Sequence, residues 1–272
     1  MQNRLRGAIF ASAKAALITA LGVMPIVGQA QAYKASRTAD GKPDLNGIWE
    51  ALNTANWDIQ GHAARAGQVV ALGAVGAVPA GLGVVEGDEI PYLPAAAAKK
   101  KENFENSLTA DPEIRCYLPG VPRATYMPFP FQILQTPKYI LMAYEFAGAS
   151  RTIYMENPPS SPFDTWMGHS IGHWEGDTLV VDVTSFNDQT WFDRAGNFHS
   201  DALHVVERYT PLSPAALTYE VTIEDPKVFS RPWKMSMPLY RRLDKNAQLL
   251  EFQCVEFVEE LMYGHLRKQP SK

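Results

Sequence analysis

The feature that most constrains the fold is a succession of short runs, rich in β-branched and aromatic residues, that begins after Asp111. Pro, Gly, Asn and Asp separate these runs, and apolar and polar residues alternate within them, which is typical of antiparallel β-strands. We predict strands at residues 131–135, 139–146, 150–155, 170–174, 178–184, 203–210, 217–224, 233–241 and 249–255.

Most connections between these predicted strands are short. Residues 136–138 and Glu175-Gly176-Asp177 contain the Pro and Gly that tight hairpin turns need. Consecutive hairpins form a meander, and a long meander hides its edge strands most easily by closing into a barrel. The predicted fold is therefore mainly β, an antiparallel meander that closes into a lipocalin-like barrel.

The N-terminal sequence indicates export. Basic residues precede an apolar run at 15–27, which ends in the small-residue pattern Ala30-Gln31-Ala32. This arrangement is typical of a secretory signal peptide, so we predict cleavage after Ala32 and a periplasmic or secreted protein. The apolar run is shorter than the about 20 residues that a membrane helix needs, and we predict no membrane span.

The segment before the predicted strands has a different composition. Residues 61–94 are rich in Gly, Ala, Val and Pro, but no strand–loop–helix unit surrounds the glycines, which argues against a phosphate-binding loop. A loop of this length in a compact protein is usually functional or disordered. We predict a signal peptide at 1–32, an N-terminal extension with a Gly/Ala/Pro-rich flap at 33–110, a short helix at 94–107 within it, and a β-barrel domain at 111–272.

Composition limits the class of partner. The chain is 46% hydrophobic and 20% charged, with a net charge of −4, which is too small and too mixed to favour a nucleic acid or an anionic membrane. We expect a small-molecule partner, and the sequence leaves the oligomeric state open. Cys116 and Cys254 are the two cysteines. An oxidising compartment permits them to pair, and two buried free thiols are the alternative.

The stretch 166–208 concentrates candidate functional residues, including four of the six histidines. Its connection at 186–201 is long, aromatic and charged, and connections of that kind on a β scaffold often carry sites. His199 and Asp201 can share one side of an extended segment, where the carboxylate orients the imidazole for proton exchange with a substrate. Asp193 is the alternative orienting carboxylate.

Two other kinds of site are weaker. The pairs His169/His173 and His199/His204 offer metal ligands, but ligands four residues apart on a strand are separated by roughly 13 Å, and no closed metal signature is present. Gly168-His169-Ser170-Ile171-Gly172 matches the letters of the G-x-S-x-G motif without its strand-to-helix context. We therefore predict no metal ligand and no cofactor.

Polar side chains also recur on one face of successive predicted strands. Either this face points to solvent or it lines a polar cavity in the barrel, and the solvent face is the commoner arrangement. The residues are Asp182, His204, Arg208, Glu220 and Glu251.

Arg and Tyr residues suit an aromatic acid or phenol. Arg151 or Arg208 can hold an anionic group by a two-pronged bond, and Tyr126 or Tyr154 can exchange a proton with a phenol of similar acidity. We predict as catalytic the residues His199, Asp201, Asp193, His204 and Tyr126. We predict as substrate-binding the residues Arg151, Arg208, Tyr154, Trp174, Trp191, Asn187 and His169.

The chain also resembles a family. The motifs DLNGIW, CYLPGVPR, PFQILQTP, GHSIGHWEGDTLVVDVTSFND and TIEDPK occur in order, and they resemble a large family of exported bacterial proteins, most of them uncharacterised. The resemblance covers nearly all of the chain after residue 32, but the flap at 61–94 lies outside its pattern, so we expect the flap to set the substrate of this member. It points, without roles, to Arg151, His169, Trp174, Glu175, Asp182, Asn187, Trp191, Asp193, His199, Ser200, His204, Glu207 and Arg208.

The function predicted from the sequence is a periplasmic, cofactor-independent lyase or decarboxylase that acts on an aromatic, phenolic small molecule. Small β-barrels with Tyr, Arg and Glu inside are similar to phenolic acid decarboxylases, which is an analogy of fold. Two alternatives remain at this point, a non-catalytic carrier of an apolar or aromatic ligand and a metal-dependent hydrolase.

Overall fold

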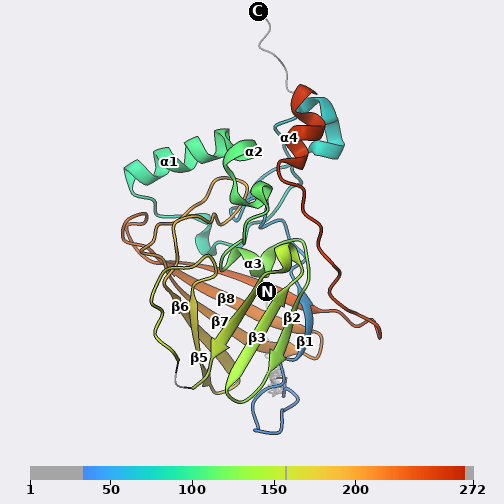
Figure 1. Cartoon of the computed structure of the whole chain (residues 1–272), viewed down its shortest axis with the longest axis vertical. Coiled ribbons are helices and arrows are strands. Elements are labelled where there is room, and N and C mark those ends of the chain that lie inside the picture. The colour runs from blue at the N-terminus through green and yellow to red at the C-terminus, as the bar shows by residue number, and fades with distance from the viewer. Residues whose placement is uncertain (1–32, 157, 267–272) are drawn as a thin grey trace, which may run out of the picture. The chain divides into compact units, whose positions relative to one another are not determined.

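The computed structural model describes residues 33–156 and 158–266, and the described residues from Tyr33 onward belong to one compact unit. The predicted signal peptide at 1–32 lies outside the described residues. Nine strands form one closed barrel in chain order, β1 to β9, as Figure 1 shows. The prediction of a mainly β protein built on a closed barrel is confirmed.

The strands alternate direction along most of the barrel. They are β1 Gly47–Glu50, β2 Phe131–Gln135, β3 Tyr139–Tyr144, β4 Ser150–Tyr154, β5 His169–Glu175, β6 Thr178–Thr184, β7 His204–Ser213, β8 Ala216–Glu224 and β9 Trp233–Arg241. Every neighbouring pair is antiparallel except β4 and β5, which are parallel. The barrel closes where Trp49 of β1 pairs with Arg241 of β9.

The parallel pair corrects the prediction of a wholly antiparallel meander. Parallel neighbours need a crossover of about a dozen residues or more, and the proline-containing connection at 155–168 supplies one. In the described chain, β4 meets β5 only at Ile153↔Ser170 and Tyr154↔Ile171. The first residues of β4 therefore have no paired β5 residues beside them, although the nine strands form a closed barrel.

The ninth strand comes from the N-terminal segment. The predicted strand at 249–255 does not form, because side chains hold that segment: Phe252 packs on Phe129 and Phe146. A short helix, α4 Val258–Tyr263, follows it. β1 takes the ninth place, so the barrel is not confined to residues 111–272.

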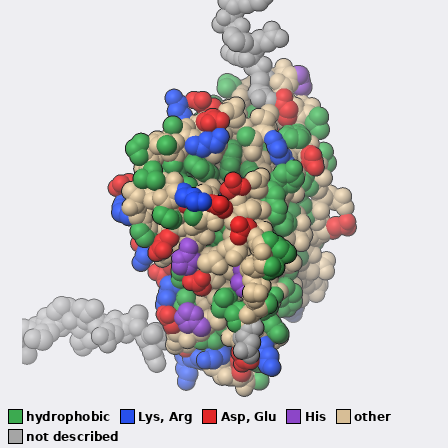
Figure 2. Space-filling view, turned by 60° about the vertical axis from the view of Figure 1, so that its left-hand side comes forward, with side chains coloured by type: hydrophobic (Ala, Val, Ile, Leu, Met, Phe, Trp, Pro, Cys, Tyr) green, Lys and Arg blue, Asp and Glu red, His purple; other side chains and the backbone are tan. Residues whose placement is uncertain are grey.

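Alternation along the strands separates the barrel interior from its outer surface. Val205, Glu207 and Tyr209 of β7 are buried inside, whereas His204 and Arg208 of the same strand are partly exposed. The other polar positions of the predicted face, Asp182, Glu220 and Glu251, are also partly or fully exposed. The solvent-face alternative is confirmed, and the polar-cavity alternative is wrong. Figure 2 shows acidic, basic and histidine side chains interspersed over one face of the molecule.

Helices and the flap cover one end of the barrel (Figure 1). The helices are α1 Pro94–Glu105, α2 Ser107–Ala110 and α3 Arg123–Tyr126, with short 3-10 turns at Val70–Gly76, Glu86–Asp88, Pro112–Arg115, Phe146–Gly148 and Gly264–Leu266. The predicted helix at 94–107 is present as α1, which begins at Pro94. No helix in the described part of the chain is both long enough and apolar enough to cross a membrane.

The flap is fixed to itself and to the barrel by isolated bridges. His62 pairs with Gly81 and Arg65 with Val78, so its two limbs run antiparallel. Val85 then pairs with Met235 of β9. The flap is thus a folded lobe that lies over the barrel end.

Cys116 and Cys254 form a disulfide, with their Cα atoms 5.8 Å apart. Of the two alternatives that the sequence left open, a disulfide or two free thiols, the structure therefore has the disulfide. The bond ties the segment after the Pro112–Arg115 turn to the C-terminal segment, which carries α4.

Candidate functional site

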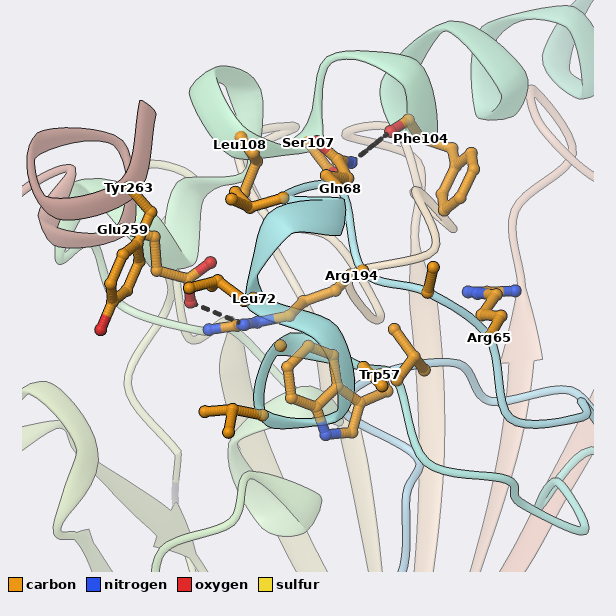
Figure 3. A pocket seen from close by; sticks show the side chains of 17 residues that line it. Trp57, Arg65, Gln68, Leu72, Phe104, Ser107, Leu108, Arg194, Glu259 and Tyr263 are labelled. Carbon is orange, nitrogen blue, oxygen red and sulfur yellow. Dashed lines mark hydrogen bonds and ion pairs between the residues drawn. The ribbon is translucent and has the colours of Figure 1, made fainter. Parts of the chain in front are cut away.

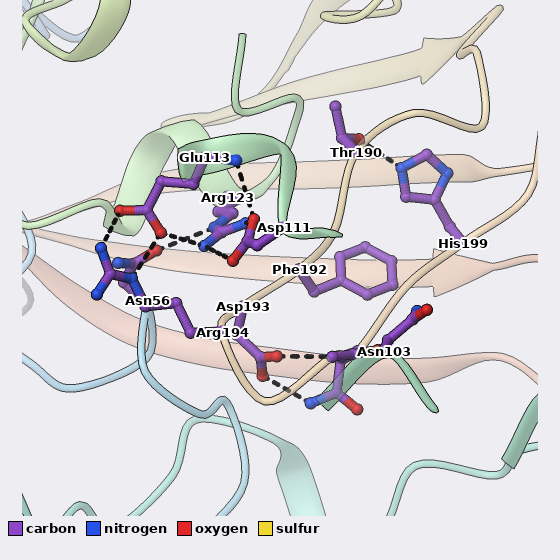
Figure 4. Close-up of polar contacts among 12 residues, drawn as sticks. Asn56, Asn103, Asp111, Glu113, Arg123, Thr190, Phe192, Asp193, Arg194 and His199 are labelled. Atoms are coloured by element: carbon purple, nitrogen blue, oxygen red, sulfur yellow. Dashed lines mark hydrogen bonds and ion pairs between the residues drawn. The ribbon is translucent and has the colours of Figure 1, made fainter. Parts of the chain in front are cut away.

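The loop at 186–201, where the sequence places most catalytic candidates, carries buried side chains, and Figure 4 shows Thr190, Phe192, Asp193 and His199 among them. Phe192 is buried, with its ring edge-on to Trp233 at 5.7 Å. Asn197 donates its backbone and side-chain N–H groups to Asp193 at 3.1 and 2.6 Å. The polar groups of the loop thus bind one another.

His199 is buried, and both of its ring nitrogens are occupied. Nδ1 lies 2.8 Å from the Ser200 carbonyl oxygen, to which it donates, and Nε2 lies 2.6 Å from the Thr190 hydroxyl, from which it accepts. Burial lowers the pKa of His199, because charging a desolvated imidazole is unfavourable. His199 is therefore a neutral imidazole held in one orientation, which is the arrangement of a structural residue.

Asp193 is fully buried and accepts three hydrogen bonds, two from Asn197 and one from the Ile59 backbone N–H at 2.9 Å. Burial and the nearby Asp58 raise the pKa of Asp193 to about 7. The Asp193 carboxyl group thus connects Ile59, just before the flap, to the loop at 186–201. A change in its protonation state therefore changes the hydrogen bonds that hold the loop.

A second buried network stands beside this loop, also shown in Figure 4. Arg123 of α3 donates to Asp111 at 2.9 and 3.1 Å and to Glu113 at 2.5 Å. Arg194 of the loop donates to both oxygens of Glu113, at 2.8 and 2.9 Å. Two guanidinium groups thus form ion pairs with two carboxylates. These ion pairs hold the loop against the segment that carries Asp111 and Glu113.

The remaining predicted catalytic residues lie elsewhere. Asp201 is exposed and binds Lys227 at 2.6 Å, so it does not orient His199. His204 lies on the outer barrel surface between Asp182 and Glu224, at 2.9 and 3.4 Å. Tyr126 is buried, and its hydroxyl donates to the Phe192 carbonyl at 2.9 Å. The structure does not bring the five residues into one site.

Four of the predicted substrate-binding residues also lie apart. Arg208 pairs with Glu175 at 2.9 Å on the outer surface. Trp174 packs against the hydrophobic core, and the backbone of Trp191 forms an isolated β-bridge with Phe198. The Asn187 side chain accepts a hydrogen bond from the backbone N–H of Gln189 in the same turn.

The other three, Arg151, Tyr154 and His169, line one pocket. We call it the strand-gap pocket, because it lies where β4 and β5 lack a shared ladder. It has a volume of about 340 Å³. Its lining residues are Leu118, Ser150, Arg151, Thr152, Tyr154, Thr165, Trp166, Met167, Gly168, His169 and Ser170.

Aromatic rings form part of the wall of the strand-gap pocket. The Tyr154 ring lies 5.4 Å from the His169 ring, tilted by 32°. Trp166 meets Tyr117 edge-on at 5.1 Å. Gly168 has φ +69°, and a side chain there would collide with Val183, so glycine lets the chain pass close to β6 before it enters β5.

The pocket also borders a charged pair inside the barrel. Arg151 donates to Glu207 at 2.6 and 3.0 Å, and the hydroxyls of Tyr209 and Tyr219 donate to Glu207 at 2.9 and 2.6 Å. Although burial opposes its charge, Glu207 and neighbouring tyrosines raise the pKa of Arg151 above its usual range. The charged pair is therefore neutral overall and well bonded.

Two buried nitrogens beside this pocket remain without a hydrogen-bond partner among the described residues, Nε of Arg151 and Nε2 of His169. A buried polar atom left unpaired costs about 1–3 kcal/mol. A ligand hydroxyl or carbonyl that reached either nitrogen would recover that cost. The pocket thus combines aromatic walls with one N–H donor and one imidazole nitrogen.

Tyr209 and Tyr219 are not among the residues predicted for the site, and the family resemblance points to Glu207 without giving it a role. A signal was available, because Glu207 lies on the otherwise apolar face of β7, between Val205 and Tyr209. A carboxylate at an inward position needs a buried partner. Arg151, inward on β4, is that partner.

Within residues 33–156 and 158–266, no three His, Cys, Asp or Glu side chains converge to hold a metal ion. His173, for example, pairs with Glu175 at 3.1 Å on the exposed side of β5. Ser170 lies within β5, buried, with Nη1 of Arg151 at 3.4 Å. It has no strand-to-helix turn to expose it as a nucleophile.

No protein-family model matches the chain, and comparisons with curated proteins and with solved structures give no match either. The family resemblance drawn from the sequence motifs stays a prediction.

Proposed function

We propose that this protein is a lyase that acts on a small phenolic molecule in the strand-gap pocket, using its own side chains for proton transfer. One observation carries the proposal: Arg151, Tyr154 and His169, which the sequence singles out for binding such a molecule, line the same pocket. Two of them hold buried nitrogens without partners.

In this proposal His169 takes the acid/base role that the sequence assigns to His199. His199 has both ring nitrogens bonded inside the loop, whereas Nε2 of His169 is unpaired beside the pocket. A general base must reach the proton that it abstracts. For this role, a phenol bound beside Tyr154 has to bring its hydroxyl to that buried nitrogen.

The chemistry follows from the phenol. His169 accepts the phenolic proton, and the oxygen electron pair moves into the ring and places negative charge on the carbon that carries the leaving fragment. That carbon takes up the proton held by His169, its bond to the fragment breaks, and the bonding electrons restore the ring as a phenolate. An uncharged hydroxyalkyl fragment passes its hydroxyl proton to the phenolate and leaves as an aldehyde or ketone. In the decarboxylating case the fragment leaves as CO₂ and a C–H bond replaces a C–C bond.

The charge balance of the pocket bears on the substrate. Because Glu207 already neutralises Arg151, the pair offers a hydrogen-bond donor and little net positive charge. A neutral phenol therefore suits the pocket better than a phenolic carboxylate. This favours a lyase whose leaving fragment is uncharged over a decarboxylase.

The test compares two histidines of one strand. His169→Gln removes the proposed base, and His173→Gln changes an exposed histidine of β5 with a 58% exposed side chain. Turnover of a panel of phenols, with and without a carboxylate, is measured by mass spectrometry of the products. We expect H169Q to lower kcat by about 10²-fold or more and H173Q to leave it unchanged. Equal activity in both variants would contradict the proposal.

A non-catalytic carrier is the second candidate. The observation that favours it is the firm bonding of Arg151, whose two terminal nitrogens are both held by Glu207. If phenols bind wild type and H169Q but no member of the panel is converted, the carrier function replaces the lyase.

A further inference from the structure

A second pocket lies on the flap side of the molecule and shares no lining residue with the strand-gap pocket. We call it the flap pocket. It has a volume of about 250 Å³ and is bordered by the flap, the α1–α2 segment and α4 (Figure 3). Its lining residues are Trp57, Arg65, Ala66, Gly67, Gln68, Val69, Leu72, Val75, Gly76, Ala77, Val78, Phe104, Ser107, Leu108, Arg194, Glu259 and Tyr263.

Aromatic and aliphatic side chains make up much of its wall. Trp57 and Leu72 line it from the N-terminal segment and the flap, and Phe104 and Leu108 from the α1–α2 segment. Pockets for drug-sized ligands usually measure about 300–1,000 Å³. The flap pocket is smaller, so it suits a compact ring system.

The two arginines of the flap pocket differ in how many of their N–H donors already have partners in the protein. Arg194 donates to Glu113 and to Glu259 at 3.0 Å, and it lies over the Trp57 ring at 4.6 Å. Its guanidinium is thus held on several sides. It acts as part of the pocket wall.

Arg65 keeps donors free. Its one ion pair within the described chain is with Asp58, where a single nitrogen lies 3.4 Å from the carboxylate. Its guanidinium lies 5.2 Å from the centre of the Phe104 ring. Figure 3 shows Arg65 and Phe104 together on one side of the pocket, with Glu259 and Tyr263 on the opposite side. A planar guanidinium with free donors beside an aromatic ring suits a carboxylate attached to an aromatic system.

We propose that the flap pocket binds an aromatic monocarboxylate, with its ring between Trp57, Leu72 and Phe104 and its carboxylate on Arg65. The proposal does not depend on the function of the strand-gap pocket. The guanidinium donors of Arg65 that Asp58 leaves free select the carboxylate, and the apolar wall selects the ring.

The test uses 2-naphthoate as the probe and titration calorimetry as the measurement. Arg65→Gln removes the anion-binding group. Arg37→Gln is the matched control, because Arg37 has the same side-chain exposure of 36% and also pairs with one aspartate, far from the pocket. We expect one binding event in wild type, at least tenfold weaker in R65Q and unchanged in R37Q. The neutral analogue 2-naphthylmethanol should bind wild type more weakly and be insensitive to R65Q.

A second variant fixes the location of the bound probe. Leu72→Trp fills the flap pocket and should abolish binding of both compounds, whereas H169Q should leave both unchanged. No binding to wild type, or equal affinity in wild type and R65Q, would overturn the proposal. Weakening by H169Q without weakening by R65Q would assign the probe to the strand-gap pocket and also overturn it.

Discussion

Arg151 of β4 and Glu207 of β7 form a two-pronged ion pair inside the barrel, with nitrogen–oxygen distances of 2.6 and 3.0 Å. The pair connects strands that are not neighbours in the barrel wall. It is also the charged group that borders the strand-gap pocket, so it links the stability of the fold to the candidate site.

Removing one member of this pair should be costly. Glu207→Gln leaves the buried Arg151 without a counter-charge, and we expect the free energy of unfolding to fall by about 3–5 kcal/mol. Urea denaturation followed by circular dichroism measures it. Glu175→Gln breaks the exposed pair with Arg208, and solvent screening means that it should change the stability little. Similar losses of unfolding free energy in both variants would show that the buried pair contributes no more to stability than the exposed pair.

Asp193 should make stability depend on pH. Its pKa in the folded protein is about 7, raised by burial and by Asp58, whereas an aspartate in the unfolded chain releases its proton near pH 4. Between about pH 4 and 7 the folded state thus holds a proton that the unfolded state has lost. Its contribution therefore makes stability fall as pH rises, by at most about 1.4 kcal/mol per pH unit.

The variant that tests this linkage is Asp193→Asn. It places an amide opposite the N–H donors of Asn197 and Ile59, so it should be less stable than wild type at pH 4. The difference between wild type and D193N should shrink as pH rises to 7. A difference that stays constant over this range would exclude Asp193 as a proton-linked group.

The disulfide should hold the C-terminal segment on the molecule. Cys116 and Cys254 anchor this segment near α4, which supplies Glu259 and Tyr263 to the flap pocket. We expect the double variant C116S/C254S to lose about 2–5 kcal/mol of unfolding free energy. Limited trypsin digestion should cut it at exposed Lys245 sooner than wild type. Identical cleavage in the two proteins would mean that other contacts suffice to hold the segment.

The sequence predicts most of the barrel because the strands carry their own signal. β5 to β9 alternate buried and exposed side chains along most of their length, and tight turns join β5 to β6 and β7 to β8. The ninth strand was harder to locate. β1 is only four residues long, and its place is set by pairing with the distant β2 and β9, which local pattern does not encode.

The candidate site is predictable in part. The sequence predicts Arg151, Tyr154 and His169 as binding residues, although no local pattern indicates that they share a pocket. The two-residue spacing of His199 and Asp201 predicts that they face one side of an extended segment. In the structure the Asp201 side chain reaches Lys227 instead, since the loop buries His199 and leaves Asp201 exposed.

The central claim is that the strand-gap pocket is where this protein meets its small molecule. The most direct measurement is a titration of histidine-labelled protein with phenol, in which NMR follows the imidazole signals of His169, His173 and His204. We predict that the His169 signal shifts and saturates, while those of His173 and His204 on the outer surface stay in place. Saturable binding of phenol that leaves the His169 signal unmoved would contradict the account.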